Sequence, residues 1–261
     1  MRVKAVFFDI DGTLVSFRTH RIPASTRDAL FQLREKGIKT FVATGRPWMI
    51  IDNLEDCPFD GFITMNGSSC FTSEFEPIFQ RSIPKDNIQR LIDSGLANRY
   101  IFEFASDHDM FITGINDRVL EITRLINLSP PRIAPLEEAL KSDYYEMMGY
   151  FTAEEAMEEQ VFENVLPDCL PMRWHPLFTD IIVRGNSKSV GIDHVLAHYG
   201  INLSESMAFG DGGNDIPMLQ HVGVSVAMGN AEQKVKDVAD YITTSVDDDG
   251  VLQALKHFNV L

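Results

Sequence analysis

Asp9 and Asp11 follow an apolar run near the start of the chain, in the segment DIDGTL. The run before them, residues 3–8, is interrupted only by Lys4 and predicts a buried strand. Gly12 permits a sharp turn where that strand ends. Because a buried carboxylate without a partner is costly, the pair needs a cation or protonation. The segment therefore predicts a site for a divalent metal and a reacting anion, against the alternative of a surface turn with two solvated aspartates.

Two further polar segments also come directly after predicted strands. Thr44 follows the strand of residues 39–43, in the segment KTFVATGRP. Asp211 follows the strand of residues 206–209, in the segment GDGGND. The carboxyl ends of parallel strands lie on one edge of a sheet, and ligands bind there in open α/β folds. Asp9, Thr44 and Asp211 are therefore expected to meet in one pocket.

The order of the predicted elements indicates an α/β protein with a second unit inserted into it. Strands and helices alternate up to about residue 82 and again after residue 184, which predicts a parallel sheet with helices on both faces. Between them, residues 83–183 mix strands and helices in the manner of an α+β unit with an antiparallel sheet. Within that insertion, residues 153–165 are expected to be helical, with Thr152 and Glu155 forming a capping box, and residues 129–135 to be a loop.

Composition limits the partners that this chain can have. The formal net charge of −15 argues against nucleic acid and anionic membranes as partners. The three cysteines are widely spaced and form no CxxC pair, which favours a reduced, cytoplasmic protein over a disulfide or zinc framework. No stretch approaches the ~18 apolar residues of a membrane span, and no signal peptide is recognised at the N-terminus. An anionic substrate would need local cations to overcome the charge of the whole chain.

The motifs resemble those of the haloacid-dehalogenase superfamily of phosphohydrolases. DIDGTL, Thr44, Lys188 and GDGGND stand in the order of that family's four motifs and span most of the chain. The ATGRP spelling and the long insertion between the second and third motifs are similar to the Cof-type branch with a C2B cap, in particular to bacterial hexose-phosphate phosphatases. The resemblance implies a Rossmann-like catalytic core of residues 1–82 and 184–261, with a C2B-type cap of residues 83–183.

The resemblance also implies roles for the acidic residues. Asp9 would be the nucleophile, and it needs no activating base because a carboxylate with a pKa of about 3.9 is ionised at neutral pH. Asp11 would be the general acid and base. Mg²⁺ would be held by Asp9, Asp211 and the backbone carbonyl of Asp11, while Asp215 would orient the metal's waters or cap the helix that it opens.

Other residues are expected to hold the substrate. The candidate ligands of its phosphate group are Thr44, Gly45, Lys188 and Asn214. The candidate contacts to the rest of the substrate are Arg46, Asn66, Trp174, His175 and Asp180. For each of these the sequence also permits a purely structural role: a salt bridge for Arg46, a turn for Asn66, and packing for the three residues of the insertion.

The sequence therefore predicts a Mg²⁺-dependent phosphatase that acts on a small phosphate ester, most simply a sugar phosphate. A phosphomutase or phosphotransferase would use the same Asp9 and Asp11, and release of inorganic phosphate distinguishes it from a phosphatase. A non-catalytic, sugar-phosphate-binding regulatory protein on this fold is the alternative from another class. Neither the physiological sugar nor the oligomeric state can be read from the sequence.

Overall fold

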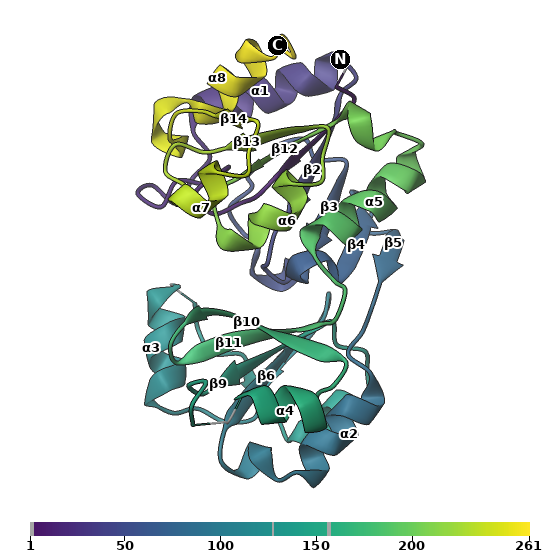
Figure 1. Ribbon diagram of the computed structural model, residues 1–261, viewed down its shortest axis with the longest axis vertical. Helices are drawn as coiled ribbons and strands as arrows, with labels where there is room; N and C mark the ends of the chain where they lie inside the picture. Colours follow the sequence, from purple (N-terminus) through teal and green to yellow (C-terminus); the bar gives the residue numbers. More distant parts are fainter. Residues whose placement is uncertain (1–2, 127, 156–157) are drawn as a thin grey trace. The chain divides into compact units, whose positions relative to one another are not determined.

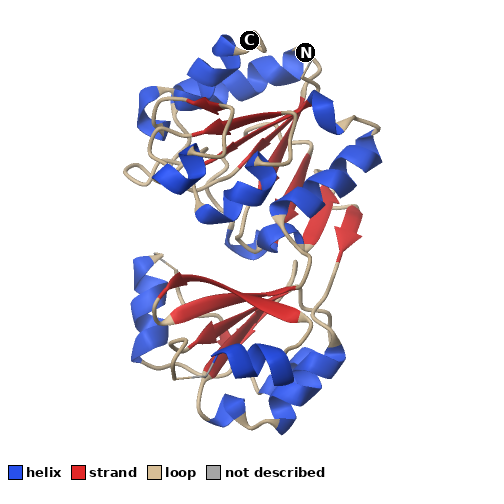
Figure 2. Ribbon diagram, in the orientation of Figure 1, coloured by secondary structure: helices blue, strands red, loops and turns tan. Residues whose placement is uncertain are grey.

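A computed structural model of the protein describes residues 3–126, 128–155 and 158–261 (Figure 1). The chain divides into two compact units. The first comprises Met1–Arg46, Ile50–Gln80 and Asn186–Leu261, and the second comprises Pro47–Met49 and Arg81–Gly185. Each unit is built on its own sheet, as the colouring by secondary structure shows (Figure 2).

The first unit, the core, contains an eight-stranded sheet in the order β14-β13-β12-β1-β2-β3-β4-β5. The six strands from β14 to β3 are parallel, and β4 and β5 continue the sheet in antiparallel pairing. In chain order the strands are β1 (Ala5–Phe8), β2 (Lys39–Ala43), β3 (Gly61–Thr64), β4 (Ser69–Thr72), β5 (Pro77–Gln80), β12 (Ser206–Gly210), β13 (Val224–Ala227) and β14 (Tyr241–Ile242).

Helices lie on both faces of this sheet (Figure 1). The core helices are α1 (Ala24–Glu35), α5 (Lys188–Tyr199), α6 (Ile216–Leu219), α7 (Gln233–Lys236) and α8 (Gly250–His257). Alternate strand residues such as Phe7, Phe41 and Ile63 share one buried cluster with Val195 of α5 and Met218 of α6. Helices α1 and α8 lie together in Figure 1. Because the parallel strands are apolar on both faces, helices must cover both.

The second unit, the cap, contains a six-stranded sheet in the order β10-β11-β9-β6-β7-β8. All of its pairs are antiparallel except that of β7 with β8. Its core is formed by alternate strand residues, among them Phe102, Phe104 and Ile181, packed with Leu91 and Phe162 from two helices. Its elements are α2 (Lys85–Asp93), β6 (Ile101–Ala105), β7 (Met110–Ile112), α3 (Asp117–Leu125), β8 (Arg132–Ile133), β9 (Glu146–Tyr150), α4 (Glu158–Asn164), β10 (Cys169–His175) and β11 (Phe178–Val183).

The fold class expected from the sequence is confirmed: a mainly parallel α/β core with a separate mixed-sheet cap. Helix α3 was missed, although Asn116 caps it by accepting a hydrogen bond from the Val119 N–H at 3.1 Å. The expected loop of residues 129–135 contains the short strand β8, because Arg132 and Ile133 pair with β7. Of the helices in the described part of the chain, none has the length and apolar character needed to cross a bilayer.

A buried carboxyl group in the cap sheet makes the stability of this unit depend on pH. Glu103 is 6% exposed, and its Oε2 accepts a hydrogen bond from the Tyr150 hydroxyl at 2.7 Å. Burial raises the pKa of Glu103 to about 7, although the Tyr150 hydrogen bond opposes the shift. The folded state therefore holds a proton that the unfolded state loses above its own lower pKa. The free energy of unfolding therefore falls as the pH rises from the lower pKa of Glu103 in the unfolded chain to its pKa of about 7 in the folded protein, because the folded state binds more protons in this range.

We expect Glu103→Gln to stabilise the cap increasingly as the pH rises, since glutamine keeps the acceptor for Tyr150 and never ionises. Its advantage in the free energy of unfolding should grow by about 2 kcal/mol between pH 5.5 and pH 8. Urea denaturation at the two pH values measures this, with the exposed Glu163→Gln in the same unit as the control. An advantage that stays constant with pH would contradict a protonated Glu103.

Candidate functional site

The polar segments predicted to meet do lie at one edge of the core sheet. Asp9, Thr44 and Asp211 each come directly after a strand, β1, β2 and β12 respectively. These three strands are parallel neighbours, with β1 in the middle. Asp9 and Thr44 are buried, at 7% and 1% exposed, so the edge is a recessed polar site rather than a solvated turn.

Lys188 is the cation at the centre of this site. Its Nζ donates to Oδ1 of Asp9 at 2.5 Å and to Oδ1 of Asp215 at 2.6 Å. The helix that positions it, α5, begins at Lys188 because the Ser187 side chain accepts from the Val190 N–H. Burial would lower the pKa of Lys188, but the charges of Asp215 and Asp9 outweigh this and raise it. Lys188 is therefore a fixed positive charge at any physiological pH.

The acidic groups outnumber that cation. Asp9, Asp211 and Asp215 each offer a carboxylate oxygen, and these oxygens lie within 4.8 Å of one another. Burial, followed by the charge of Asp215, raises the pKa of Asp9 well above its usual range and that of Asp211 to about 7, and Lys188 only partly offsets both. When all three carboxyl groups are ionised, three carboxylates facing one ammonium leave two negative charges, which a bound cation would stabilise. Hard oxygen donors with this excess charge fit a divalent cation such as Mg²⁺.

Asp215 makes more contacts than the helix cap that the sequence permitted. Its side chain makes no capping bond to α6. Instead Oδ2 accepts from the backbone N–H groups of Asp211 and Gly212, at 2.9 and 2.8 Å, while Oδ1 receives Lys188. Asp215 therefore does not cap α6, but its carboxylate accepts from the Gly212 N–H at the start of the 3₁₀ turn Gly213–Asp215 that precedes α6. The Asp215 carboxylate is directed toward the residues that precede it in the loop, because the N–H groups of Asp211 and Gly212 point at it. Through these bonds and the bond from Lys188, it orients both Asp211 and Lys188.

Two residues that the sequence did not single out hold the Asp211 carboxylate. The Thr13 hydroxyl donates to Oδ1 of Asp211 at 2.9 Å. The Asn230 amide donates to Oδ2 of Asp211 at 3.2 Å and to the Gly12 carbonyl at 2.9 Å. Thr13 belongs to the DIDGTL segment, so its motif could have drawn attention to it. For Asn230 the only signal was its place after the end of β13, at the same edge of the sheet.

Asp11 forms an ion pair with Arg46. Nε and Nη2 of Arg46 donate to the two carboxylate oxygens of Asp11, both at 2.7 Å, in the bidentate geometry typical of strong arginine–carboxylate pairs. Of the two roles that the sequence permitted for Arg46, the structure contains the salt bridge. The side chain of Asp11 is therefore directed toward Arg46 and stands outside the cluster of Asp9, Asp211 and Asp215.

The candidate phosphate ligands of the second and fourth motifs lie against one another. The Asn214 amide donates to Oδ1 of Asn66 at 3.1 Å. A Cβ on Gly45 would lie 3.3 Å from the Asn66 amide and 3.4 Å from that of Asn214, so glycine suits this position. Thr44 accepts from the Asn66 N–H through its carbonyl at 3.1 Å and from the Arg46 N–H through its hydroxyl at 3.0 Å. The backbone after β2 is thus held in a defined loop.

A left-handed turn after β3 supports that loop. Met65, Asn66 and Gly67 have φ values of 47°, 52° and 91°. A Cβ on Gly67 would lie 2.1 Å from the Ser187 carbonyl oxygen, so only glycine lets this turn approach the residue before Lys188. The turn therefore links the segment containing Thr44 to the start of α5.

The cap residues predicted to contact substrate lie on β10 and β11. His175 lines a hollow of about 630 Å³ in the cap, together with residues of α3 that include Leu120, Glu121 and Arg124. Asp180 is partly buried and pairs with Met148 and Met172 in the sheet. The side chain of Trp174 lies outside the described part of the structure.

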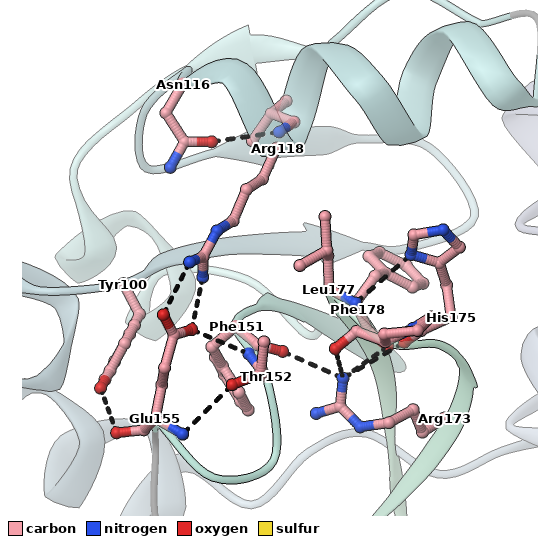
Figure 3. Close-up of polar contacts among 12 residues, drawn as sticks. Tyr100, Asn116, Arg118, Phe151, Thr152, Glu155, Arg173, His175, Leu177 and Phe178 are labelled. Carbon is pink, nitrogen blue, oxygen red and sulfur yellow. Dashed lines mark hydrogen bonds and ion pairs between the residues drawn. The ribbon is translucent and has the colours of Figure 1, made fainter.

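Arg173 organises the turn that carries His175 (Figure 3). Its Nη1 donates to the carbonyl oxygens of Phe151, Pro176 and Phe178 at 3.0 Å and to that of His175 at 3.3 Å. Because one guanidinium nitrogen donates hydrogen bonds to all of these carbonyl oxygens, it fixes the backbone of the β10–β11 turn.

The predicted capping box is also present in Figure 3. Glu155 Oε2 accepts from the Thr152 N–H at 3.1 Å, and the Thr152 hydroxyl accepts from the Glu155 N–H at 3.2 Å. Arg118 of α3 pairs with both carboxylate oxygens of Glu155. Residues 156–157, inside the expected helix, lie outside the described residues, and α4 is described from Glu158.

Comparison with known proteins yields matches over nearly the whole chain. The model of the haloacid dehalogenase-like hydrolase family matches residues 6–255. YkrA of Bacillus subtilis (strain 168) is 32% identical, and the alignment covers 100% of both chains. The HAD subclass IIB sugar phosphatase BT4131 is 42% identical with a TM-score of 0.87, over 99% of this chain and 100% of that one. BT1666 of Bacteroides thetaiotaomicron, from a study of HAD phosphatases, is 35% identical with a TM-score of 0.91, over 100% and 96%.

Proposed function

The chain belongs to the haloacid dehalogenase-like hydrolase family and is a phosphatase of that type, and we propose that it hydrolyses sugar phosphates with Mg²⁺ through an aspartyl-phosphate on Asp9. The observation that carries this proposal is the recessed cluster of Asp9, Asp211 and Asp215 around Lys188 at the ends of parallel strands. A phosphatase implies a phosphate-ester substrate, and this cluster is the place where its phosphorus would be attacked.

In the first step Asp9 attacks phosphorus. A bond forms between its carboxylate oxygen and phosphorus while the bond from phosphorus to the leaving oxygen breaks, and Asp11 protonates that oxygen. In the second step Asp11 removes a proton from water as the water oxygen bonds to phosphorus. The bond to Asp9 then breaks, and inorganic phosphate leaves. Asp11 must exchange its contact with Arg46 for these proton transfers, since both of its oxygens are engaged in that ion pair.

The charged groups around Asp9 favour this chemistry. Lys188 holds one Asp9 oxygen, which leaves the other free to attack, and its charge attracts the phosphate. Thr44, Gly45 and Asn214 would bind phosphate oxygens through hydroxyl, backbone N–H and amide groups. Asp9, Asp211 and the carbonyl of Asp11 would hold Mg²⁺, and Asp215 would orient Asp211 and Lys188 through its hydrogen bonds. When bound, the ion would supply positive charge that offsets the repulsion between carboxylates and phosphate.

Sugar phosphates are the proposed substrates for two reasons. BT4131, at 42% identity, is a sugar phosphatase. The hollow beside His175 combines carboxylate, guanidinium and aliphatic side chains, which suits the hydroxyls and C–H groups of a sugar. Trp174, His175 and Asp180 are the proposed cap contacts, and Arg46 and Asn66 the proposed core contacts.

The test is a panel of phosphate esters assayed with MgCl₂ for release of inorganic phosphate and ranked by kcat/KM. We expect hexose and pentose phosphates to rank highest, and EDTA to abolish turnover. Transfer of the phosphoryl group to a second sugar without release of phosphate would favour a phosphomutase or phosphotransferase. Binding of sugar phosphates without turnover would favour a regulatory protein.

Substitution in the cap should change the choice of substrate and leave the chemistry intact. We expect His175→Ala and Asp180→Ala to alter the ranking of sugar phosphates by about 10-fold or more in kcat/KM, since hydrogen bonds to substrate hydroxyls discriminate strongly. The Mg²⁺ dependence should stay unchanged because the cation ligands belong to the core. Exposed Glu137→Ala is the matched control in the cap. An unchanged ranking in both variants would show that these residues do not contact the sugar.

A further inference from the structure

Asn230 connects the two loops that carry the cation ligands. Its side-chain Nδ2 donates to the Gly12 carbonyl at 2.9 Å and to Oδ2 of Asp211 at 3.2 Å. Gly12 belongs to the loop after β1, which carries Asp9 and Asp11, and Asp211 begins the loop after β12. One amide therefore spans two segments that are 199 residues apart in the sequence (211 − 12).

The two loops approach each other closely at this point. Gly12 has a φ of 82°, and a Cβ there would lie 2.2 Å from Oδ2 of Asp211. The Asp211 carboxylate thus packs against the Gly12 backbone. The Gly12 carbonyl and this carboxylate are both hydrogen-bond acceptors, so a group with two N–H donors is needed to bridge them. The amide of Asn230 supplies two N–H groups and carries no charge, so it can bind both acceptors without neutralising the ligand.

Asn230 is itself anchored by a third segment. Its Oδ1 accepts from the Val246 N–H at 3.0 Å, which fixes the orientation of the amide. Oδ1 of Asp211 is meanwhile held by the Thr13 hydroxyl at 2.9 Å. Both oxygens of the carboxylate are therefore oriented by hydrogen bonds. Such partners hold a metal ligand in its binding geometry, and their loss typically weakens metal affinity by about 10–100-fold.

We propose that Asn230 is a positioning residue that sets the affinity of the site for Mg²⁺ by tying the Asp211 carboxylate to the Asp9–Gly12 loop. The inference rests on the proposed function, since it presumes the cation site described there. Asn230 hydrogen-bonds with the Asp211 carboxylate, the Gly12 carbonyl and the Val246 N–H, none of which is a proposed phosphate ligand. Its loss should therefore weaken the binding of the metal while a fully loaded enzyme keeps its chemistry.

The test compares Asn230→Ala with the wild type in two titrations with MgCl₂. One follows the melting temperature without substrate, and the other follows turnover. We expect the midpoint of both titrations to rise about 10–100-fold. At saturating MgCl₂, kcat should stay within a few-fold of wild type. Thr13→Val, which removes the other hydrogen bond to Asp211 with little change of shape, should shift the midpoint in the same direction. Exposed Asn98→Ala is the control and should shift neither titration.

The outcomes separate this role from a structural one and from failure of the proposed function. A lower melting temperature without MgCl₂, combined with a midpoint within twofold of wild type, would make Asn230 a structural bridge and overturn the proposal. Asn230→Ser, which keeps a small polar side chain, provides the same comparison if the alanine variant is insoluble. A wild type that neither responds to MgCl₂ nor turns over phosphate esters would overturn the proposed function, and this inference with it.

Discussion

Asp9→Asn should reduce turnover by about 10⁴-fold or more, the scale seen when a catalytic nucleophile is removed. The amide has the size of the carboxylate but cannot attack phosphorus to give an acyl phosphate. The fold should persist, because burial and the charge of Asp215 already disfavour an ionised Asp9, and asparagine can still accept from Lys188. Phosphate release measured with MgCl₂ and the best sugar phosphate tests this expectation.

The matched control is Asp28→Asn, the same chemical change at an exposed position of α1. It should leave both turnover and melting temperature unchanged. Mass spectrometry after acid quenching should detect phosphate on the wild type and none on Asp9→Asn. Turnover above about 1% of wild type in a verified Asp9→Asn sample would contradict the nucleophile assignment, given the loss expected for such a residue.

Asp11→Asn should separate substrates by their leaving groups. Asparagine cannot supply a proton, so turnover of sugar phosphates, whose leaving groups are alkoxides, should fall by about 10²–10⁴-fold. p-Nitrophenyl phosphate needs little protonation on departure and should lose much less in its first step. The ratio of kcat/KM for the two substrates is the decisive measurement, because kcat/KM reports that first step.

The ion pair with Arg46 provides a concrete structural alternative for Asp11. If Asp11 only held Arg46 in place, its replacement would disturb every substrate alike. Equal losses for sugar and p-nitrophenyl phosphates would therefore contradict the general-acid role. Arg46→Gln is the informative companion variant, since it removes the bidentate pair and leaves the Asp11 carboxylate intact. Its leaving-group ratio should resemble that of the wild type more than that of Asp11→Asn.

Much of this protein could be predicted from local patterns. Apolar runs mark buried strands, and polar residues directly after them mark the edge of a parallel sheet. The fold class was predicted on that basis and the family from the resemblance of four ordered motifs, and both are confirmed. The capping box of Thr152 and Glu155 could also be predicted from a local pattern, since its partners are three residues apart and meet in a single turn.

Local patterns did not predict two short elements of the cap, helix α3 and strand β8. Helix α3 has only nine residues and was missed between two strands, although Asn116 caps it. Strand β8 has two residues within a proline-rich segment, and only its pairing with β7 makes it a strand. Short elements of this kind depend on tertiary contacts more than on their own propensity.

Local sequence patterns indicate which residue types stand at the ends of the strands, because the alternation of apolar and polar residues is a local property. Which of these residues pair with one another depends on the folded arrangement of the chain. Lys188 reaches Asp9 across 179 residues, Asp11 turns toward Arg46, and Asn230 reaches Gly12 across 218 residues. The reason is physical: hydrogen-bond partners are selected by distances of about 3 Å between side chains, and only the packing of distant loops against one another sets those distances.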